Sequence, residues 1–194
     1  MKAMKLIAPT CWLGCLALWL SVLAAAAQPR QIILLRHAEK GSDPADNHLS
    51  LKGRERALAL VPYLTETPEL LTNGLPVALF ASGTQKATHS FRSMETLAPL
   101  GKHLNQPVLS WFVNKEVEAL ADFILRQRSY QGKTIVVCWT HEYIPELIAA
   151  LGVPSPARKM KSSEFDRLYL ITYKDRKATI QDLPQRLLYG DSSR

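Results

Sequence analysis

Ile32-Ile-Leu-Leu-Arg36-His37-Ala-Glu-Lys40 is a short apolar run that leads directly into an arginine and a histidine. A strand buried on both faces reads as a continuous apolar run, and ligands of open α/β sheets bind beyond the carboxyl ends of such strands. We therefore expect Arg36 and His37 to stand together at one edge of a sheet. A guanidinium suits phosphate or carboxylate oxygens, while a neutral imidazole can act as nucleophile, base or metal ligand.

Other apolar runs end in polar residues in the same way. Strands are predicted at Pro76–Ala81, ending at Ser82, and at Thr134–Trp139, ending at Thr140-His141-Glu142, with a short one at Val108–Trp111. Two further strands, Leu168–Tyr173 and Ala178–Gln181, close the chain. If the central strands are parallel, Arg36, His37, His141 and Glu142 converge on one crevice.

Segments of helical spacing separate the strands. Ser50 is a good N-cap for the first, in which Ala57, Leu58, Val61 and Leu64 form the apolar face. The predicted helices are Leu51–Leu64, Ala87–Leu100, Glu116–Arg128 and Ile144–Leu151. Strands that alternate with helices predict a single three-layer α/β/α domain with a mostly parallel central sheet.

The first 27 residues have the pattern of a signal peptide. Lys2 and Lys5 precede the apolar stretch Cys11–Leu23, and four alanines then offer a cleavage site before Gln28. An uncleaved membrane anchor is the alternative, although the stretch is shorter than the roughly 20 residues of a bilayer span. We expect export to the periplasm or the medium, with residues 28–194 as the folded domain.

Composition limits the classes of partner. The chain has 194 residues, 47% of them hydrophobic, and a formal net charge of +7, which becomes +5 without Lys2 and Lys5. This moderately basic charge favours an anionic substrate or surface, and because the basic residues are scattered it does not by itself indicate nucleic acid. Cys138 is the one cysteine left after residue 27, so no internal disulfide is expected, and its apolar neighbours predict a buried thiol.

Four motifs together resemble the histidine phosphatase superfamily, the phosphoglycerate-mutase-like proteins. The motifs are Leu35-Arg-His-Ala-Glu39, Leu49-Ser-Leu-Lys-Gly53-Arg-Glu-Arg-Ala57, Ser82 with Arg92-x-x-x-Thr96, and Val136-Val-Cys-Trp-Thr-His141. Their order and spacing carry the resemblance from Gln31 to Tyr173. The family usually has glycine where Ala38 stands, and the spacing from Ser82 to Arg92 is longer than usual.

The resemblance implies that His37 is a nucleophile that takes up a phosphoryl group before water removes it. Arg36, Arg92 and His141 then supply donors for the equatorial phosphate oxygens, as phosphoryl transfer requires. The substrate expected is a small-molecule or protein phosphomonoester. No cofactor is expected and no metal-binding motif occurs, and after removal of the signal peptide no stable membrane insertion is expected.

The proton donor for the leaving group has three candidates. Glu142 is our first choice, because one branch of the family carries its acid just after the second histidine and burial can raise a carboxyl pKa. Glu116 stands where the other branch carries its acid, but it also fits the solvated face of an amphipathic helix. Glu39 is the third, although it also fits a surface ion pair with Lys40 or Arg54.

Other functions remain open at this point. A phosphomutase is the nearest enzymatic rival, but it needs a larger lid and cofactor pocket. A phosphate- or phosphoprotein-binding module would keep the pocket without turnover. Arg158, Lys159 and Lys161 fit solvated surface charge, or a cluster that attracts anionic substrates to the mouth of the site.

Overall fold

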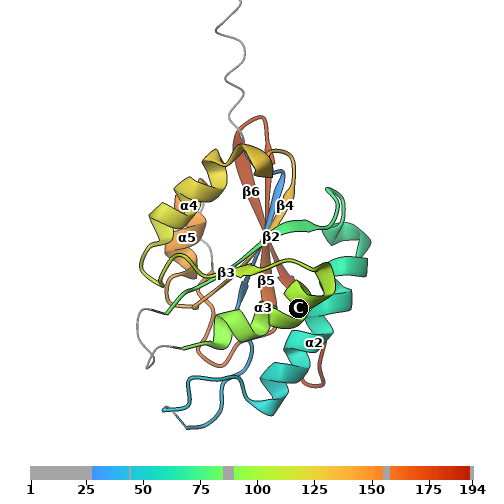
Figure 1. Ribbon diagram of the computed structural model, residues 1–194, viewed down its shortest axis with the longest axis vertical. Helices are drawn as coiled ribbons and strands as arrows, with labels where there is room; N and C mark the ends of the chain where they lie inside the picture. Colours follow the sequence, from blue (N-terminus) through green and yellow to red (C-terminus); the bar gives the residue numbers. More distant parts are fainter. Residues whose placement is uncertain (1–27, 44, 85–89, 155–157, 193–194) are drawn as a thin grey trace, which may run out of the picture.

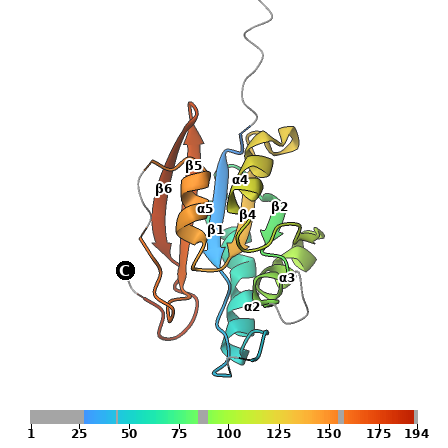
Figure 2. The same cartoon turned by 90° about the vertical axis from the view of Figure 1, so that its left-hand side faces the viewer.

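A computed structural model describes residues 28–43, 45–84, 90–154 and 158–192. Their strands form a sheet in the order β3-β2-β4-β1-β5-β6, in which β3, β2, β4 and β1 are parallel and β5 is antiparallel to both neighbours. Figure 2 shows β5 and β6 at one side of this sheet. The strands are β1 (Gln31–Arg36), β2 (Pro76–Ala81), β3 (Val108–Leu109), β4 (Thr134–Trp139), β5 (Arg167–Lys174) and β6 (Lys177–Pro184).

Helices cover both faces of the sheet. Figure 1 shows α2 and α3 on one side and α4 and α5 on the other, which confirms the predicted three-layer α/β/α domain. The helices are α2 (Leu51–Glu66), α3 (Arg92–Leu104), α4 (Val117–Arg126) and α5 (Ile144–Ala150), with 3₁₀ turns η2 (Pro68–Leu70) and η3 (Arg128–Tyr130). None of the helices in the described ranges is long and apolar enough to span a bilayer. The predicted signal peptide lies outside these ranges.

Side chains of β1 alternate between two apolar layers. Ile32 and Leu34 pack with the residues beneath α4 and α5, whereas Ile33 and Leu35 pack with those beneath α2 and α3. All four side chains are fully buried. The continuous apolar run of the sequence therefore marks a strand that is covered on both faces, and the predicted bounds of β1 and β4 are confirmed.

The predicted helix Ala87–Leu100 is displaced along the chain. The helix α3 begins at Arg92 and continues through Pro99 to Leu104, while Ala87 lies outside the described residues. Asn105 ends it in the left-handed conformation (φ 51°), with its N–H donated to the carbonyls of Gly101 and Lys102. Asparagine tolerates this conformation better than most residues, so the helix ends at Asn105.

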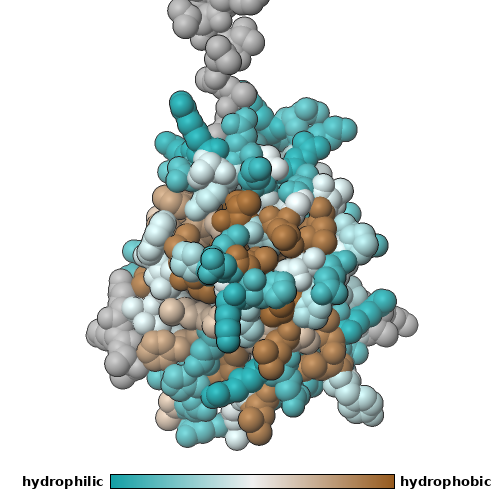
Figure 3. Space-filling model, turned by 45° about the vertical axis from the view of Figure 1, so that its right-hand side comes forward, coloured by the Kyte–Doolittle hydropathy of each residue, from teal (hydrophilic) through white to brown (hydrophobic). Residues whose placement is uncertain are grey.

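Leu58 was wrongly assigned to the apolar face of its helix. Its side chain is 63% exposed, and that of Leu51, one heptad earlier, is 82% exposed. Figure 3, in which the right-hand side of Figure 1 comes forward, shows apolar surface among the polar residues. Leu60 and Arg56 are the buried residues of this part of the helix. The charged Arg56 can be buried because it pairs with two carboxylates inside the protein.

The start of α2 is fitted closely against the segment that follows β1. Ser50 caps the helix by accepting the Gly53 N–H (3.1 Å), and both the N–H and the hydroxyl of Ser50 donate to the Glu39 carbonyl. A Cβ on Gly53 would lie 2.3 Å from the Glu39 carbonyl oxygen, which leaves no room for a side chain. Glycine at position 53 thus allows α2 to touch the backbone two residues after His37.

Gly53→Ala is expected to destabilise the protein by about 1–3 kcal/mol, because the added methyl group forces the helix away from the Glu39 backbone. Urea denaturation measures this loss, with Lys52→Ala as the control at an exposed neighbour on the same helix. Equal stability of the two variants would contradict the close contact.

Candidate active site

Three parallel strands bring their polar ends together. The pairing of β1 with β4 places Arg36 beside Trp139, and the His37 N–H extends the ladder by donating to the Trp139 carbonyl (3.1 Å). On the other side of β4, the Ser82 N–H donates to the Cys138 carbonyl (3.1 Å). As expected from the sequence, the segments that contain His37, Ser82 and His141 therefore meet at one end of the sheet.

His37 is buried with one ring nitrogen engaged. Nδ1 lies 2.7 Å from the carbonyl oxygen of Ala38, so it carries the proton and donates, which leaves the Nε2 lone pair free. Burial lowers the pKa of His37 to about 4, and the charges of Arg36, Arg92 and His141 lower it in the same direction. The imidazole is therefore neutral at physiological pH, as a nucleophile requires.

Arg36 is held by backbone carbonyls from a distant loop. One of its terminal nitrogens donates to the carbonyls of Lys161 (3.0 Å) and Glu164 (2.8 Å), and the Phe165 ring lies 4.0 Å from the guanidinium carbon. Burial lowers the pKa of Arg36 to about 10, so it remains charged. Its Nε is buried without a hydrogen-bond partner among the described residues, and this free donor fits an oxyanion.

His141 and Glu142 lie close enough to Arg36 and His37 to influence their titration. Burial lowers the pKa of His141, with Arg36 adding to the effect and Glu142 opposing it. Glu142 is exposed, so the burial that we expected of the proton donor is not found, and its charge raises the pKa of Arg36. The sequence-based expectation that these four groups share one site therefore agrees with the geometry.

Arg92 approaches the site from α3 but is tied to the loop before α2. Its guanidinium donates to the carbonyl of Asp46 and, through Nε, to that of His48 (3.1 Å). The charge of Arg92 nevertheless lowers the pKa values of Arg36 and His37, which places it near both. These two bonds direct the guanidinium toward the loop before α2, so only its remaining N–H groups can donate to a phosphate.

Thr96, one turn further along α3, fixes the residue after His37. The Thr96 hydroxyl accepts the Ala38 N–H (2.9 Å) and donates to the Arg92 carbonyl (2.7 Å). The frame Arg92-x-x-x-Thr96 thus connects both site motifs directly. The frame itself can be recognised in the sequence. The hydrogen bond by which its threonine holds the backbone of the first motif cannot.

The two alternative acids have structural partners. Both Glu39 oxygens accept hydrogen bonds from Arg56, and Lys52 lies 3.9 Å away, so the expected surface pair with Lys40 or Arg54 is wrong. One oxygen of Glu116 accepts the Val113 N–H (2.9 Å), just before α4. Glu142 is the carboxylate among the three that no hydrogen bond within the described residues engages.

Arg158 is exposed, as predicted for solvated charge, but it also forms two ion pairs. It pairs with Glu164 (2.8 Å) and Asp182 (3.0 Å) and so braces the loop whose carbonyls hold Arg36. Neither that loop nor Phe165 could be linked to Arg36 from the sequence, since 125 residues or more separate them and backbone carbonyls leave no signature in side-chain patterns. The described residues contain no group of three or more potential metal ligands.

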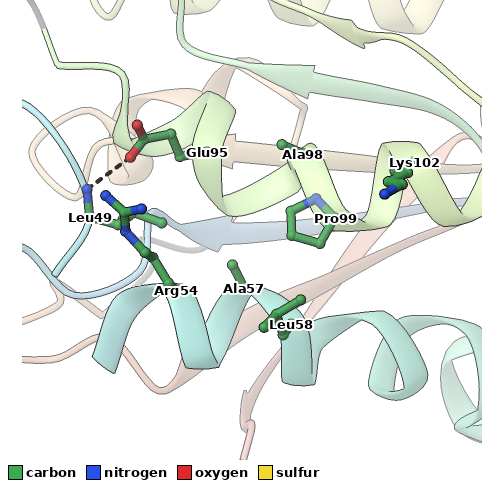
Figure 4. Close-up of a pocket in the computed structure, with 8 residues that line it drawn as sticks. All are labelled: Leu49, Arg54, Ala57, Leu58, Glu95, Ala98, Pro99 and Lys102. Atoms are coloured by element: carbon green, nitrogen blue, oxygen red, sulfur yellow. Dashed lines mark hydrogen bonds between the residues drawn. The ribbon is translucent and has the colours of Figure 1, made fainter. Parts of the chain in front are cut away.

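A separate groove of about 460 Å³ lies between α2 and α3, lined by Leu49, Arg54, Ala57, Leu58, Glu95, Ala98, Pro99 and Lys102 (Figure 4). None of the predicted catalytic residues lines it. At its end Glu95 accepts the Leu49 N–H (2.8 Å) and contacts His48 (2.5 Å), whose ring stacks on Phe91. Glu95 therefore supports the loop to which Arg92 is bound.

The sequence matches no protein-family model and no curated protein. Several solved structures are similar. A provisionally assigned α-ribazole-5′-phosphate phosphatase from Escherichia coli aligns with a TM-score of 0.50 and 16% identity over 83% of this chain and 98% of that one. A provisionally assigned phosphohistidine phosphatase SixA from Nakamurella multipartitia (TM-score 0.48, 18% identity, 82% and 98% covered) and a mycobacterial glucosyl-3-phosphoglycerate phosphatase (0.48, 14%, 78% and 95%) also align. The chain therefore shares its fold with the Escherichia coli structure, which agrees with the fold that the four motifs predict.

Proposed function

We propose that the protein is a phosphatase that hydrolyses phosphate monoesters through a phosphohistidine on His37. The observation that carries the proposal is the state of His37: buried, neutral, with Nδ1 committed to the Ala38 carbonyl and Nε2 available. The buried Arg36, with an unpartnered Nε, supplies a charge beside it. The phosphatase activity for which the Escherichia coli neighbour is named supports the same reaction class.

In the first step Nε2 of His37 attacks phosphorus in line with the ester oxygen, and a P–N bond forms as the P–O bond breaks. Arg36 and His141 stabilise the equatorial oxygens, and Arg92 joins them through its remaining N–H groups. Because burial keeps the imidazole unprotonated, no energy is spent in removing a proton before attack.

The Glu142 carboxylic acid donates a proton to the leaving alkoxide and becomes a carboxylate. That carboxylate then accepts a proton from water, whose oxygen attacks phosphorus and breaks the P–N bond, so that His37 and Glu142 return to their starting states. The Nδ1 hydrogen bond to Ala38 is kept throughout and holds the ring in one tautomer.

The substrate in this proposal is a small-molecule or protein phosphomonoester. Export remains part of the proposal and depends on the sequence pattern of residues 1–27. A phosphate-binding module is the second candidate, and the engagement of Arg92 by loop carbonyls favours it, because a guanidinium tied in this way is not yet arranged for transfer.

His37→Ala is expected to lower the hydrolysis of an aryl phosphate by at least about 10³-fold, because the covalent route is lost. Brief reaction of the wild type with a ³²P-labelled ester, followed by acid quench and by alkaline quench, measures the intermediate: a phosphohistidine survives alkali and is lost in acid. The variant should carry no label.

Cys138→Ala is a suitable control, since this buried thiol lies on the neighbouring strand and its pKa is raised to about 12 by burial. A folded wild type that binds phosphate without turnover or labelling would replace the enzyme with the binding module. Transfer of the label to a second hydroxyl in place of water would indicate a phosphomutase.

The His37 ring is expected to titrate near pH 4, because its burial disfavours the imidazolium. An NMR titration of ¹⁵N-histidine-labelled protein should show the neutral Nδ1–H form from pH 8 to pH 5 and protonation as the pH falls through about 4. The His37→Ala spectrum assigns the signal. A midpoint near the ordinary 6.5 would contradict the desolvated site.

Glu142→Gln is expected to slow hydrolysis of an alkyl phosphate by about 10²-fold or more and that of 4-nitrophenyl phosphate much less, because only the poor leaving group needs a proton. Steady-state kcat/KM on the two substrates measures the difference, because this ratio reports cleavage of the P–O bond and not the later hydrolysis of the P–N bond, in which Glu142 acts as a base. Glu116→Gln, which retains an acceptor for the Val113 N–H, is the matched control. Equal losses on both substrates would remove Glu142 from the role of acid.

A further inference from the structure

Arg56 lies at the centre of a buried network that the proposed reaction does not use. It is 2% exposed and its guanidinium faces two carboxylates. Nε and one terminal nitrogen donate to Glu39 (2.7–3.1 Å), while the two terminal nitrogens donate to Asp191 (2.7 and 2.9 Å). A further bond reaches Gln185 (3.1 Å). One fully desolvated cation thus joins residue 39 to a residue near the C-terminus.

The Glu39 end of the network belongs to the turn that carries the nucleophile. Glu39 follows His37 and Ala38, and its charge raises the pKa of Arg36, so it lies close to the phosphate-binding groups. Its carbonyl is held by Ser50 and its carboxylate by Arg56. The carbonyl and the carboxylate of Glu39 are therefore both held by α2 and its N-cap residue.

The Asp191 end belongs to residues 185–192, which we call the C-terminal brace. One Asp191 oxygen accepts the N–H groups of Leu187 (2.8 Å) and Leu188 (3.0 Å), which closes the brace into a compact turn. Although burial alone opposes ionisation, the hydrogen bonds from Arg56, Leu188 and Leu187 hold the pKa of Asp191 at about 2. The carboxylate is therefore charged at any physiological pH.

The brace also holds the opposite wall of the site. The Gln185 N–H donates to the Asp166 carbonyl (2.8 Å), and the Ser192 N–H donates to the Asp166 carboxylate (2.5 Å). Asp166 follows Phe165, whose ring covers Arg36 and lies 5.9 Å from the His37 ring. Both neighbours of the nucleophile, the turn at Glu39 and the ring of Phe165, are thus connected to the brace.

We infer that Arg56 and Asp191 are positioning residues that place His37 for attack on phosphorus, with the C-terminal brace as part of the active-site support. The inference rests on the proposed function. A nucleophile displaced by about 1 Å loses about 10²-fold in rate, whereas the fold survives such a displacement. Loss of either carboxylate would leave a buried guanidinium half-paired, and the turn and the brace would both have to adjust.

Asp191→Asn and Arg56→Gln test this role. Each should lower kcat by about 10–100-fold with inhibition by inorganic phosphate changed less than threefold, because the anion site is kept and His37 is misplaced. The double variant should lose no more than the worse single variant, since the two act through one network. The signals of His37 in ¹⁵N-histidine spectra should shift in all three.

Ile124→Ala is the matched control. Ile124 lies on α4, on the opposite face of the sheet, and is fully buried, so this variant lowers stability without contact with the brace. It should retain kcat and the His37 signals at temperatures where it is folded. If Asp191→Asn does not fold, Asp191→Glu, which keeps the charge and moves the carboxylate by one methylene group, is measured in its place.

The outcomes separate this inference from the proposed function. Unchanged kcat and unchanged His37 signals in Asp191→Asn would overturn the positioning role, whatever the change in stability. If the wild type has no phosphatase activity, the spectra still decide: shifted His37 signals would support the brace, and unshifted signals would overturn it.

Discussion

The parallel pairing of β1 with β4 is the constraint on which the site depends. It sets Arg36 beside Trp139, and the bond from the His37 N–H to the Trp139 carbonyl carries the pairing one residue beyond the strand. The proximity of His37 and His141 follows from this pairing.

Burial at the end of β1 leaves His37 and Arg36 in different protonation states. Desolvation disfavours charge on both, yet His37 loses its proton at physiological pH whereas Arg36 keeps its own. The cost of burying the guanidinium is offset by the carbonyls of Lys161 and Glu164 and by the face of Phe165. These three groups are uncharged, so they do not neutralise the guanidinium in the way that a carboxylate would. A neutral nucleophile therefore lies beside a guanidinium that keeps its positive charge, which is the arrangement that favours an incoming phosphate dianion.

The sequence predicted what depends on local pattern. β1 and β4 are continuous apolar runs, and their bounds were predicted correctly, as was the convergence of the polar residues that follow them. The errors have a common physical origin in contacts across the chain. Arg56 was not expected in the interior and Leu58 was, because helical periodicity treats every arginine as exposed, whereas the partner Asp191 is 135 residues away. The carbonyls that bind Arg36 and Arg92 are likewise invisible in a pattern of side chains.

Local and distant contacts support His37 in different ways. The bonds of the His37 and Ala38 N–H groups to Trp139 and Thr96 fix the direction of the chain as it leaves the sheet, and they are as stable as the sheet and α3. The contacts through Arg56 fix where the following turn sits, and they depend on a segment near the end of the chain. Both sets of contacts therefore bear on the rate of a reaction at His37, because a nucleophile displaced by about 1 Å from its productive position loses most of its rate.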